Sequence, residues 1–300
     1  MHVVKIACER PALRGRSLST WDCQEIAREL VRTGIVLTIS PQTVQRILAH
    51  HKLKPWRVHM WMTPTVPRDA TFVDQVRALC DLYVRPLAPT EVVLSYDEKT
   101  SIQPRPRTAP TKPAQARRAV QVEHEYVRAG ALNLLAAMDT RTGKVWGRTY
   151  DRKRQIEFID LLERIEREIL TTIHTIHVVL DNPRMHKGKA IQAWLAKHPR
   201  FRFHFTPVHC SWMNQIEEWF SILQRKRLRF SDFASKAALA AAITSFIQQR
   251  NEAPHPFKWT AQSAAKVTTW AERKVAVQIA ATTSGQTEAL APEGAAPQAA

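Results

Sequence analysis

The chain has 300 residues, of which 44% are hydrophobic, and this length is enough for about two domains with cores of their own. Its 44 Lys and Arg outnumber its 27 Asp and Glu, and the net charge of +17 favours a polyanionic partner such as nucleic acid over a merely basic soluble protein. No membrane span or signal peptide is expected, because no apolar run of about 18 residues occurs, and four cysteines without a CxxC pair favour reduced thiols in the cytoplasm over disulfides or a zinc site.

Two short helices are predicted near the N-terminus, after a basic and poorly ordered lead-in over residues 1–16. Ser19 is predicted to cap the first helix, with Asp22 three residues further on in a variant of the capping box. Ser40 followed by Pro41 predicts the start of the second helix, because Ser is a favoured N-cap and Pro fits the first helical position.

The outer face of the second helix is polar and basic, with Gln42, Thr43, Gln45 and Arg46 near its start. Two short helices around a tight turn, with such a face on the second, are typical of a helix-turn-helix that binds DNA. An ordinary helical hairpin is the alternative that the local pattern leaves open, and the basic charge favours DNA. We therefore predict a small all-α, winged-helix-like DNA-binding domain over residues 1–62.

Residues 63–90 are predicted to contain a linker and a bridging helix. Pro64 and Pro67 mark the domain boundary. A helix near 69–85 is expected to bridge to the second domain, with Phe72 and Tyr83 on its apolar face.

A basic stretch over residues 99–118 follows the first predicted strand. It contains six Lys and Arg, four Pro and no acid, which excludes a helix or a central strand. The cations that we consider as phosphate contacts in this extended loop are Arg105, Arg107, Arg117 and Arg118. A solvated surface loop without a ligand is the alternative, and the pattern does not decide between the two.

The elements that remain predict an α/β fold, a mixed sheet with helices on its faces. In chain order they are a strand at 92–98, a hairpin over 131–150, a helix over 155–170, a strand at 176–180, a helix near 187–197, a strand at 201–205, a helix from about 212 and a helix over 234–250. From about residue 281 the composition predicts disorder.

Two aspartates, Asp97 and Asp181, stand at the ends of apolar strands, where a carboxylate without a cation is costly. Glu217 lies in the helical segment that begins near 212. Three such carboxylates could hold Mg²⁺ in one cleft, and cleavage of a phosphodiester by two metal ions needs such a set. Glu98 and Glu218 are competitors, but Glu98 is expected to face away from Asp97, and Glu218 lies about a hundred degrees round the helix from Glu217.

Histidines near these acids suggest further roles. A zinc site built from His186, His204, His209 and Cys210 is not expected, because their spacing fits no standard finger. His186 follows Asp181 by five residues and could contact a phosphate or an attacking water. A helix-capping or core histidine is the alternative, and it stays open.

Three motifs resemble those of insertion-sequence-630-type transposases, which are relatives of the mariner elements. Residues 96–100 are similar to the first-aspartate motif of that family, residues 178–187 to its second, and residues 211–217 to its glutamate motif, in which the acid follows an asparagine by three residues. The 35 residues between Asp181 and Glu217 are close to the spacing of the family, and residues 256–260 resemble its C-terminal signature.

This resemblance implies a ribonuclease-H-like catalytic domain over residues 91–265, followed by a helix end and a disordered tail over 266–300. It implies that Asp97, Asp181 and Glu217 are catalytic and hold Mg²⁺ or Mn²⁺. The residues that would support these acids are Asn182, His186 and Asn214.

The resemblance also implies what such an enzyme acts on. The helix-turn-helix would bind the terminal inverted repeats of the element in double-stranded DNA, and we expect a homo-dimer on DNA in the nucleoid-associated cytoplasm. The enzyme would hydrolyse a strand at the element end and join the freed 3′ hydroxyl to target DNA.

One departure from the family leaves alternatives open. Members commonly carry two helix-turn-helix units, and this chain has room for one before Trp56, so a truncated copy is considered. A catalytically silent, DNA-binding relic is one alternative. A ribonuclease-H-like nuclease acting on another nucleic acid is the other, although a helix-turn-helix suits duplex DNA rather than A-form RNA.

Overall fold

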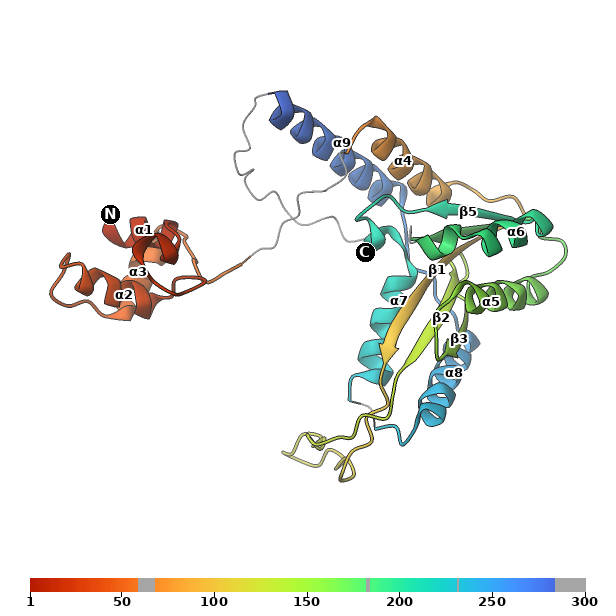
Figure 1. Ribbon diagram of the computed structural model, residues 1–300, viewed down its shortest axis with the longest axis horizontal. Coiled ribbons are helices and arrows are strands. Elements are labelled where there is room, and N and C mark those ends of the chain that lie inside the picture. Colours follow the sequence, from red (N-terminus) through yellow and green to blue (C-terminus); the bar gives the residue numbers. More distant parts are fainter. Residues whose placement is uncertain (59–67, 182–183, 231, 284–300) are drawn as a thin grey trace. The chain divides into compact units, whose positions relative to one another are not determined.

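The structure is a computed structural model that describes residues 1–58, 68–181, 184–230 and 232–283. The described residues form two compact units that divide between 58 and 68 (Figure 1). Of the described helices, none combines the length and the apolar character that a membrane span requires.

The first unit contains three α-helices. They are α1 (His2–Cys8), α2 (Cys23–Arg32) and α3 (Pro41–His50), with a 3₁₀ turn at Pro11–Arg14. Val3 and Ile6 on α1 pack with Trp21 and with the buried faces of α2 and α3. The indole nitrogen of Trp21 also donates a hydrogen bond to the carbonyl of Glu9 at 2.8 Å. The prediction of a poorly ordered lead-in was therefore wrong, because a seven-residue helix is too short to display a period.

The caps of α2 and α3 test two predictions. Asp22, and not Ser19, caps α2: its side chain accepts the backbone N–H of Glu25 at 2.7 Å. Ser40 caps α3 as predicted, since its hydroxyl accepts the N–H of Thr43 at 3.1 Å and Pro41 is the first helical residue. The described residues of this unit include no strand, and the predicted linker at 59–67 lies outside the described residues.

The second unit is built on a five-stranded mixed sheet with the order β3-β2-β1-β4-β5. The strands are β1 (Glu91–Ile102), β2 (Leu132–Asp139), β3 (Val145–Tyr150), β4 (Thr175–Leu180) and β5 (Phe201–Phe205). The predicted hairpin forms the antiparallel pair β2–β3, and β2 is also antiparallel to β1. β4 runs parallel to both β1 and β5. The predicted mixed sheet is confirmed, with β1 at its centre.

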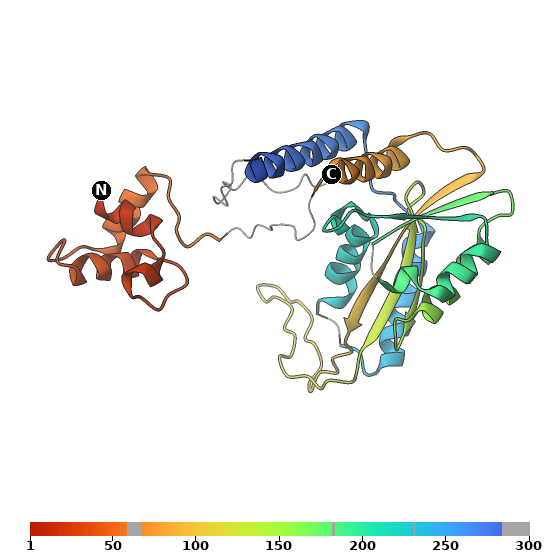
Figure 2. The same cartoon turned by 45° about the horizontal axis from the view of Figure 1, so that its top comes forward.

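Helices cover both faces of this sheet (Figures 1 and 2). Those on one face are α5 (Gln155–Glu168) and α6 (Lys189–Lys197), which pack on the apolar side chains of all five strands. Those on the other face are α7 (Ile216–Leu223) and α8 (Lys236–Glu252) over β2 and β3, and α4 (Ala70–Val84) and α9 (Ala261–Thr283) over β1 and β4. The helix predicted as a bridge, α4, therefore belongs to the core of the second unit.

Two element boundaries differ from prediction. α7 begins at Ile216, after a 3₁₀ turn at Ser211–Met213, rather than near 212. At the other end of the chain, α9 runs to Thr283, past the residue at which disorder was predicted to begin, and 284–300 lie outside the described residues.

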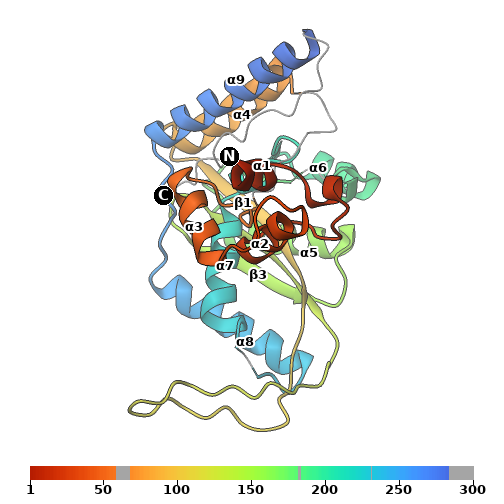
Figure 3. The same ribbon diagram turned by 90° about the vertical axis from the view of Figure 1, so that its left-hand side faces the viewer.

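A long loop over 103–131 leaves the ends of β1 and β2 and reaches beyond the sheet; we call it the arm (Figure 3). Isolated bridges such as Lys112 to Gln121 join its two sides. The predicted extended loop begins later than residue 99, because β1 continues to Ile102 through an irregularity at which Ser101 adopts a φ of 55°. Lys99 therefore lies in the strand.

Candidate active site

The parallel pairing of β1 and β4 brings the two aspartates level. Ser95 on β1 is the partner of Val179 on β4, and continuing this register by two residues sets Asp97 beside Asp181. Neighbouring strands lie about 4.8 Å apart. Two carboxylates are thus held side by side at the carboxyl edge of β4, which is the edge where open α/β sheets bind ligands.

A buried asparagine fastens the start of α7 to β1. Asn214 donates from Nδ2 to the carbonyl of Tyr96 at 2.7 Å, and its Oδ1 accepts the hydroxyl of Ser95. The same hydroxyl oxygen accepts the backbone N–H of Ile216 at 2.9 Å. Ser95 and Asn214 are almost completely buried, and Glu217 follows Asn214 by three residues. We call these contacts the latch; they hold the first turn of α7, with Glu217, against the strand that carries Asp97.

A tyrosine on α4 contacts the turn that precedes the latch. The hydroxyl of Tyr83 donates to the carbonyl of Met213 at 2.9 Å. Burial raises the pKa of Tyr83 well above its usual range, so the hydroxyl keeps its proton and remains a donor. This hydrogen bond connects α4 to the 3₁₀ turn that ends just before Asn214.

The carboxylates influence one another. Burial raises the pKa of Asp97 to about 8; the negative charges of Asp181 and Glu217 add to this, while a 2.7 Å hydrogen bond from the backbone N–H of Glu98 opposes it. Burial also raises the pKa of Asp181, against the effect of His186. The three predicted acids are therefore close enough to interact electrostatically.

Glu98 and His186 form a hydrogen-bonded pair near the two aspartates. Glu98 accepts hydrogen bonds from the hydroxyl of Tyr96 at 2.7 Å and from Nε2 of His186 at 2.9 Å. Burial raises the pKa of Glu98, but these hydrogen bonds outweigh it and leave the pKa below its usual value. As predicted, Glu98 lies on the face opposite to Asp97, since it shares the side of Tyr96. Nδ1 of His186 lies 3.4 Å from Oδ1 of Asp181.

His186 occupies a core position, the alternative that the sequence left open. Its ring is fully buried between the rings of Tyr96 and Phe158, with centroid distances of 5.5 and 4.8 Å. A fully covered ring is held by packing on two sides. It can orient Asp181 and Glu98, but it has no face turned to solvent.

The chemistry of the donors suits a hard divalent cation. Three carboxylates offer oxygen ligands, and Oδ1 of Asp181 is buried without a hydrogen-bond partner. Such an atom is costly to leave unpaired. Among the residues that the structure describes, however, no three His, Cys, Asp or Glu side chains are arranged so that they could hold a metal ion without moving.

Two lysines near these acids were not predicted as site residues. Lys99 lies two residues beyond Asp97 on the same face of β1; burial lowers its pKa, and the charge of Glu217 opposes this. Lys153 is exposed, and its charge lowers the pKa of both Glu98 and Asp181. Strand alternation could have identified Lys99, whereas the sequence near Lys153 carries no comparable signal.

The other predicted residues are distributed between the two units. Asn182 lies outside the described residues. In the arm, Arg105 and Arg107 lie over the ring of Tyr126 at 5.2 and 5.5 Å, while Arg117 and Arg118 are exposed. Arg107 also donates to the carbonyl of residue 123 at 2.6 Å, which makes it part of the framework of the arm.

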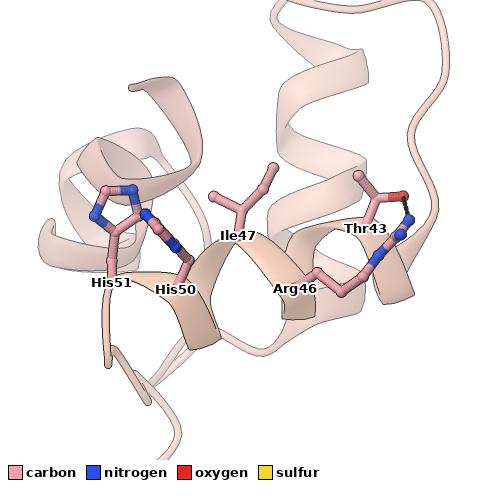
Figure 4. Close-up of a pocket in the computed structure, with 5 residues that line it drawn as sticks. All are labelled: Thr43, Arg46, Ile47, His50 and His51. Carbon is pink, nitrogen blue, oxygen red and sulfur yellow. Dashed lines mark hydrogen bonds between the residues drawn. The ribbon is translucent and has the colours of Figure 1, made fainter.

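The predicted DNA-reading face of α3 is turned outward. Gln42, Gln45 and Arg46 are exposed, and Arg46 lies 3.3 Å from the hydroxyl of Thr43. Together with residues further along α3, Thr43 and Arg46 line a surface hollow (Figure 4). Exposed polar and basic side chains on the outer face of α3 are consistent with a helix-turn-helix.

Part of the second unit is similar to known proteins. Residues 92–240 match the family described as DDE superfamily endonuclease. The Insertion element IS630 uncharacterized 39 kDa protein of Shigella sonnei is 30% identical over 115 residues, which are 38% of this chain and 33% of that protein. The alignment thus spans about a third of the length of this relative.

Two solved structures share the fold. The crystal structure of the Mos1 Strand Transfer Complex matches with a TM-score of 0.53 and 11% identity over 93% of this chain and 78% of that one. A pre-cleavage Mos1 transpososome matches with a TM-score of 0.51 and 14% identity over 91% and 78%. The predicted ribonuclease-H-like sheet with flanking helices is confirmed.

Proposed function

We propose that the chain is the DNA transposase of an insertion sequence; the match of residues 92–240 to the DDE superfamily endonuclease family and the likeness to an IS630 protein support this. It hydrolyses a phosphodiester at each element end and joins the freed 3′ hydroxyl to target DNA. The observation that carries this proposal is the parallel register of β1 and β4, which when continued by two residues sets Asp97 level with Asp181, together with the latch that holds the turn of Glu217 against β1.

The three carboxylates would hold Mg²⁺ or Mn²⁺. The bound metal would activate the attacking oxygen and stabilise the leaving oxygen of the phosphodiester. Contacts within the chain restrain two of these side chains: Asn214 holds the turn that carries Glu217, and Nδ1 of His186 lies beside Asp181 on the core side. Oδ1 of Asp181 is buried and accepts no hydrogen bond, although Nδ1 of His186 lies 3.4 Å from it, and a metal would satisfy this oxygen.

DNA contacts are proposed for both units. Gln42, Thr43, Gln45 and Arg46 on α3 would read base edges and phosphates at the terminal inverted repeat. In the arm, the exposed Arg117 and Arg118, with Arg105, would bind phosphates. Because an element has two ends, a homo-dimer on DNA would bind one end with each chain.

The experiment compares neighbouring acids in a nicking assay on duplex that carries the element end, with Mg²⁺ present. Asp181→Asn and Glu217→Gln should each lower the nicking rate by about 10²-fold or more, since each lost ligand removes several kcal/mol of charge stabilisation in the transition state. The matched control is Glu218→Gln, one residue away on the same exposed turn, which should nick normally.

DNA binding is measured beside nicking. Asp181→Asn should bind the duplex as tightly as the unsubstituted chain or more tightly, because it removes a negative charge near phosphate. Equal losses in Glu217→Gln and Glu218→Gln would contradict the assignment. An unsubstituted chain that binds the element end and never nicks it would favour the inactive relic.

A further inference from the structure

α7 continues into a π-helical turn, Gln224–Leu228, that carries three cations in a row, Arg225, Lys226 and Arg227. Arg229 and Phe230 follow, and residues 219–231 contain no acid. We call residues 224–230 the basic turn. A π-helical turn is rare and is found mostly at functional sites.

Some arginines at helices pair with a nearby acid, whereas the cations of the basic turn form no ion pair within the described residues. Arg28, Arg32 and Arg154 each pair with a glutamate three residues away. Within the described parts of the chain, none of Arg225, Lys226 and Arg229 forms an ion pair, and all three are exposed. Uncompensated cations side by side repel one another, which a bound polyanion would relieve.

An aromatic ring completes the surface. Phe230 is 62% exposed, although burial of such a side chain is favourable. The guanidinium of Arg229 lies 4.9 Å from its ring centroid. A flat ring beside cations is the combination on which unpaired bases stack while phosphates are neutralised.

The basic turn lies along the helix face that carries Glu217. Glu217 and Ser221 are four residues apart on α7 and share its exposed face, and Arg225, four residues further on in the π-helical turn, is exposed as well. At 1.5 Å per residue, Glu217 and Leu223 at the end of α7 are about 9 Å apart along the axis, and Arg225 follows in the π-helical turn. The backbone N–H of Arg107 donates to Asp232 at 2.9 Å, so the root of the arm borders the turn.

We propose that the basic turn binds an unpaired DNA strand that leads away from the three acids. Arg225, Lys226 and Arg229 bind its phosphates, and Phe230 stacks on one of its bases. This inference rests on the proposed function, in that the acids act on the same strand. An intact duplex is the competing ligand, and the experiment distinguishes the two.

The test uses the full chain with Gln45→Ala and Arg46→Ala in every sample, so that binding by α3 is weakened. Two fluorescent probes are compared: a blunt duplex, and the same duplex with a six-nucleotide single-stranded overhang that contains 2-aminopurine. Phe230→Ala and Phe230→Leu should each lose about 10-fold in affinity for the overhang probe and little for the blunt one, with loss of the 2-aminopurine quenching. Phe230→Leu keeps an apolar side chain, which guards against a folding defect.

Charge is tested with matched double variants. Arg225→Ala with Lys226→Ala should make the salt dependence of overhang binding shallower by about 1.4, at 0.7 per phosphate for a single strand. The control removes two exposed arginines from α5, Arg164 and Arg167, and should leave the slope unchanged.

Three results would overturn the inference: equal losses on both probes, equal slopes for the two double variants, or unchanged quenching in Phe230→Ala. The proposed function fails in a different way, namely if the unsubstituted chain cuts no strand with Mg²⁺. These binding measurements would remain informative in that case, because they require no cleavage.

Discussion

Replacing Asn214 by alanine separates positioning of Glu217 from the stability of the fold. The substitution removes the hydrogen bond to the carbonyl of Tyr96 and the partner of the Ser95 hydroxyl. Of the hydrogen bonds of the latch, the one from the N–H of Ile216 to the hydroxyl of Ser95 then remains. Glu217 should therefore lose its fixed distance from Asp97.

The cost in stability follows from the bonds lost. Two hydrogen bonds are worth about 1 kcal/mol each, and a buried carbonyl or hydroxyl left without its partner adds about 1 kcal/mol. Asn214→Ala should lower the free energy of unfolding by about 2–4 kcal/mol. The effect on catalysis should be larger than this loss accounts for, because a misplacement of about 1 Å can lower a rate by about 10²-fold.

The chain offers a matched control at Asn251. This asparagine also clamps a helix to a strand with two hydrogen bonds, since it accepts the N–H of Val145 at 2.9 Å and donates to its carbonyl at 2.7 Å. Asn251 lies on α8 and Val145 on β3, an edge strand that β2 and β1 separate from β4. Asn251→Ala should lower stability by about 1–3 kcal/mol and leave nicking unchanged.

The assay measures urea unfolding of both variants, and then nicking at a temperature where both are folded. Nicking by Asn214→Ala should fall about 10²-fold below that of Asn251→Ala. If both variants nick at equal rates once folded, Asn214 contributes only to stability, and the latch does not position Glu217.

Two further predictions concern backbone strain and pH. Gly143 has a φ of 80°, and a Cβ added there would lie 2.3 Å from a backbone atom; Gly130 has a φ of 82°, and a Cβ there would lie 3.4 Å from a flexible lysine side chain. Gly130→Ala should lower the free energy of unfolding by about 1–2 kcal/mol, and Gly143→Ala should lower it by more. Urea unfolding of the two variants tests this, and equal losses would contradict it. Because the pKa of Asp97 is raised to about 8, its proton stabilises the folded, metal-free chain, so the free energy of unfolding should fall between pH 4 and pH 8. In EDTA this slope should be shallower in Asp97→Asn, where only the raised pKa of Asp181 still contributes to it, and an equal slope would show that Asp97 does not titrate in this range.

Local signals in the sequence determined most of the elements. Ser40 and Pro41 start α3 because capping depends on neighbours three residues away. The β2–β3 hairpin and the apolar strands that lead to Asp97 and Asp181 also follow from patterns within a few residues. The motifs around the three acids carried the resemblance, because each is a short run of neighbouring residues that the sequence displays directly.

Only the tertiary structure decided how these elements meet. The register that sets Asp97 beside Asp181 depends on pairing between residues 84 positions apart in the sequence, and no local pattern specifies it. The latch between Asn214 and Ser95 and the contact of His186 with Glu98 are of the same kind. Each joins residues whose separate environments look ordinary in the sequence, because burial and hydrogen bonding arise only when distant segments pack together.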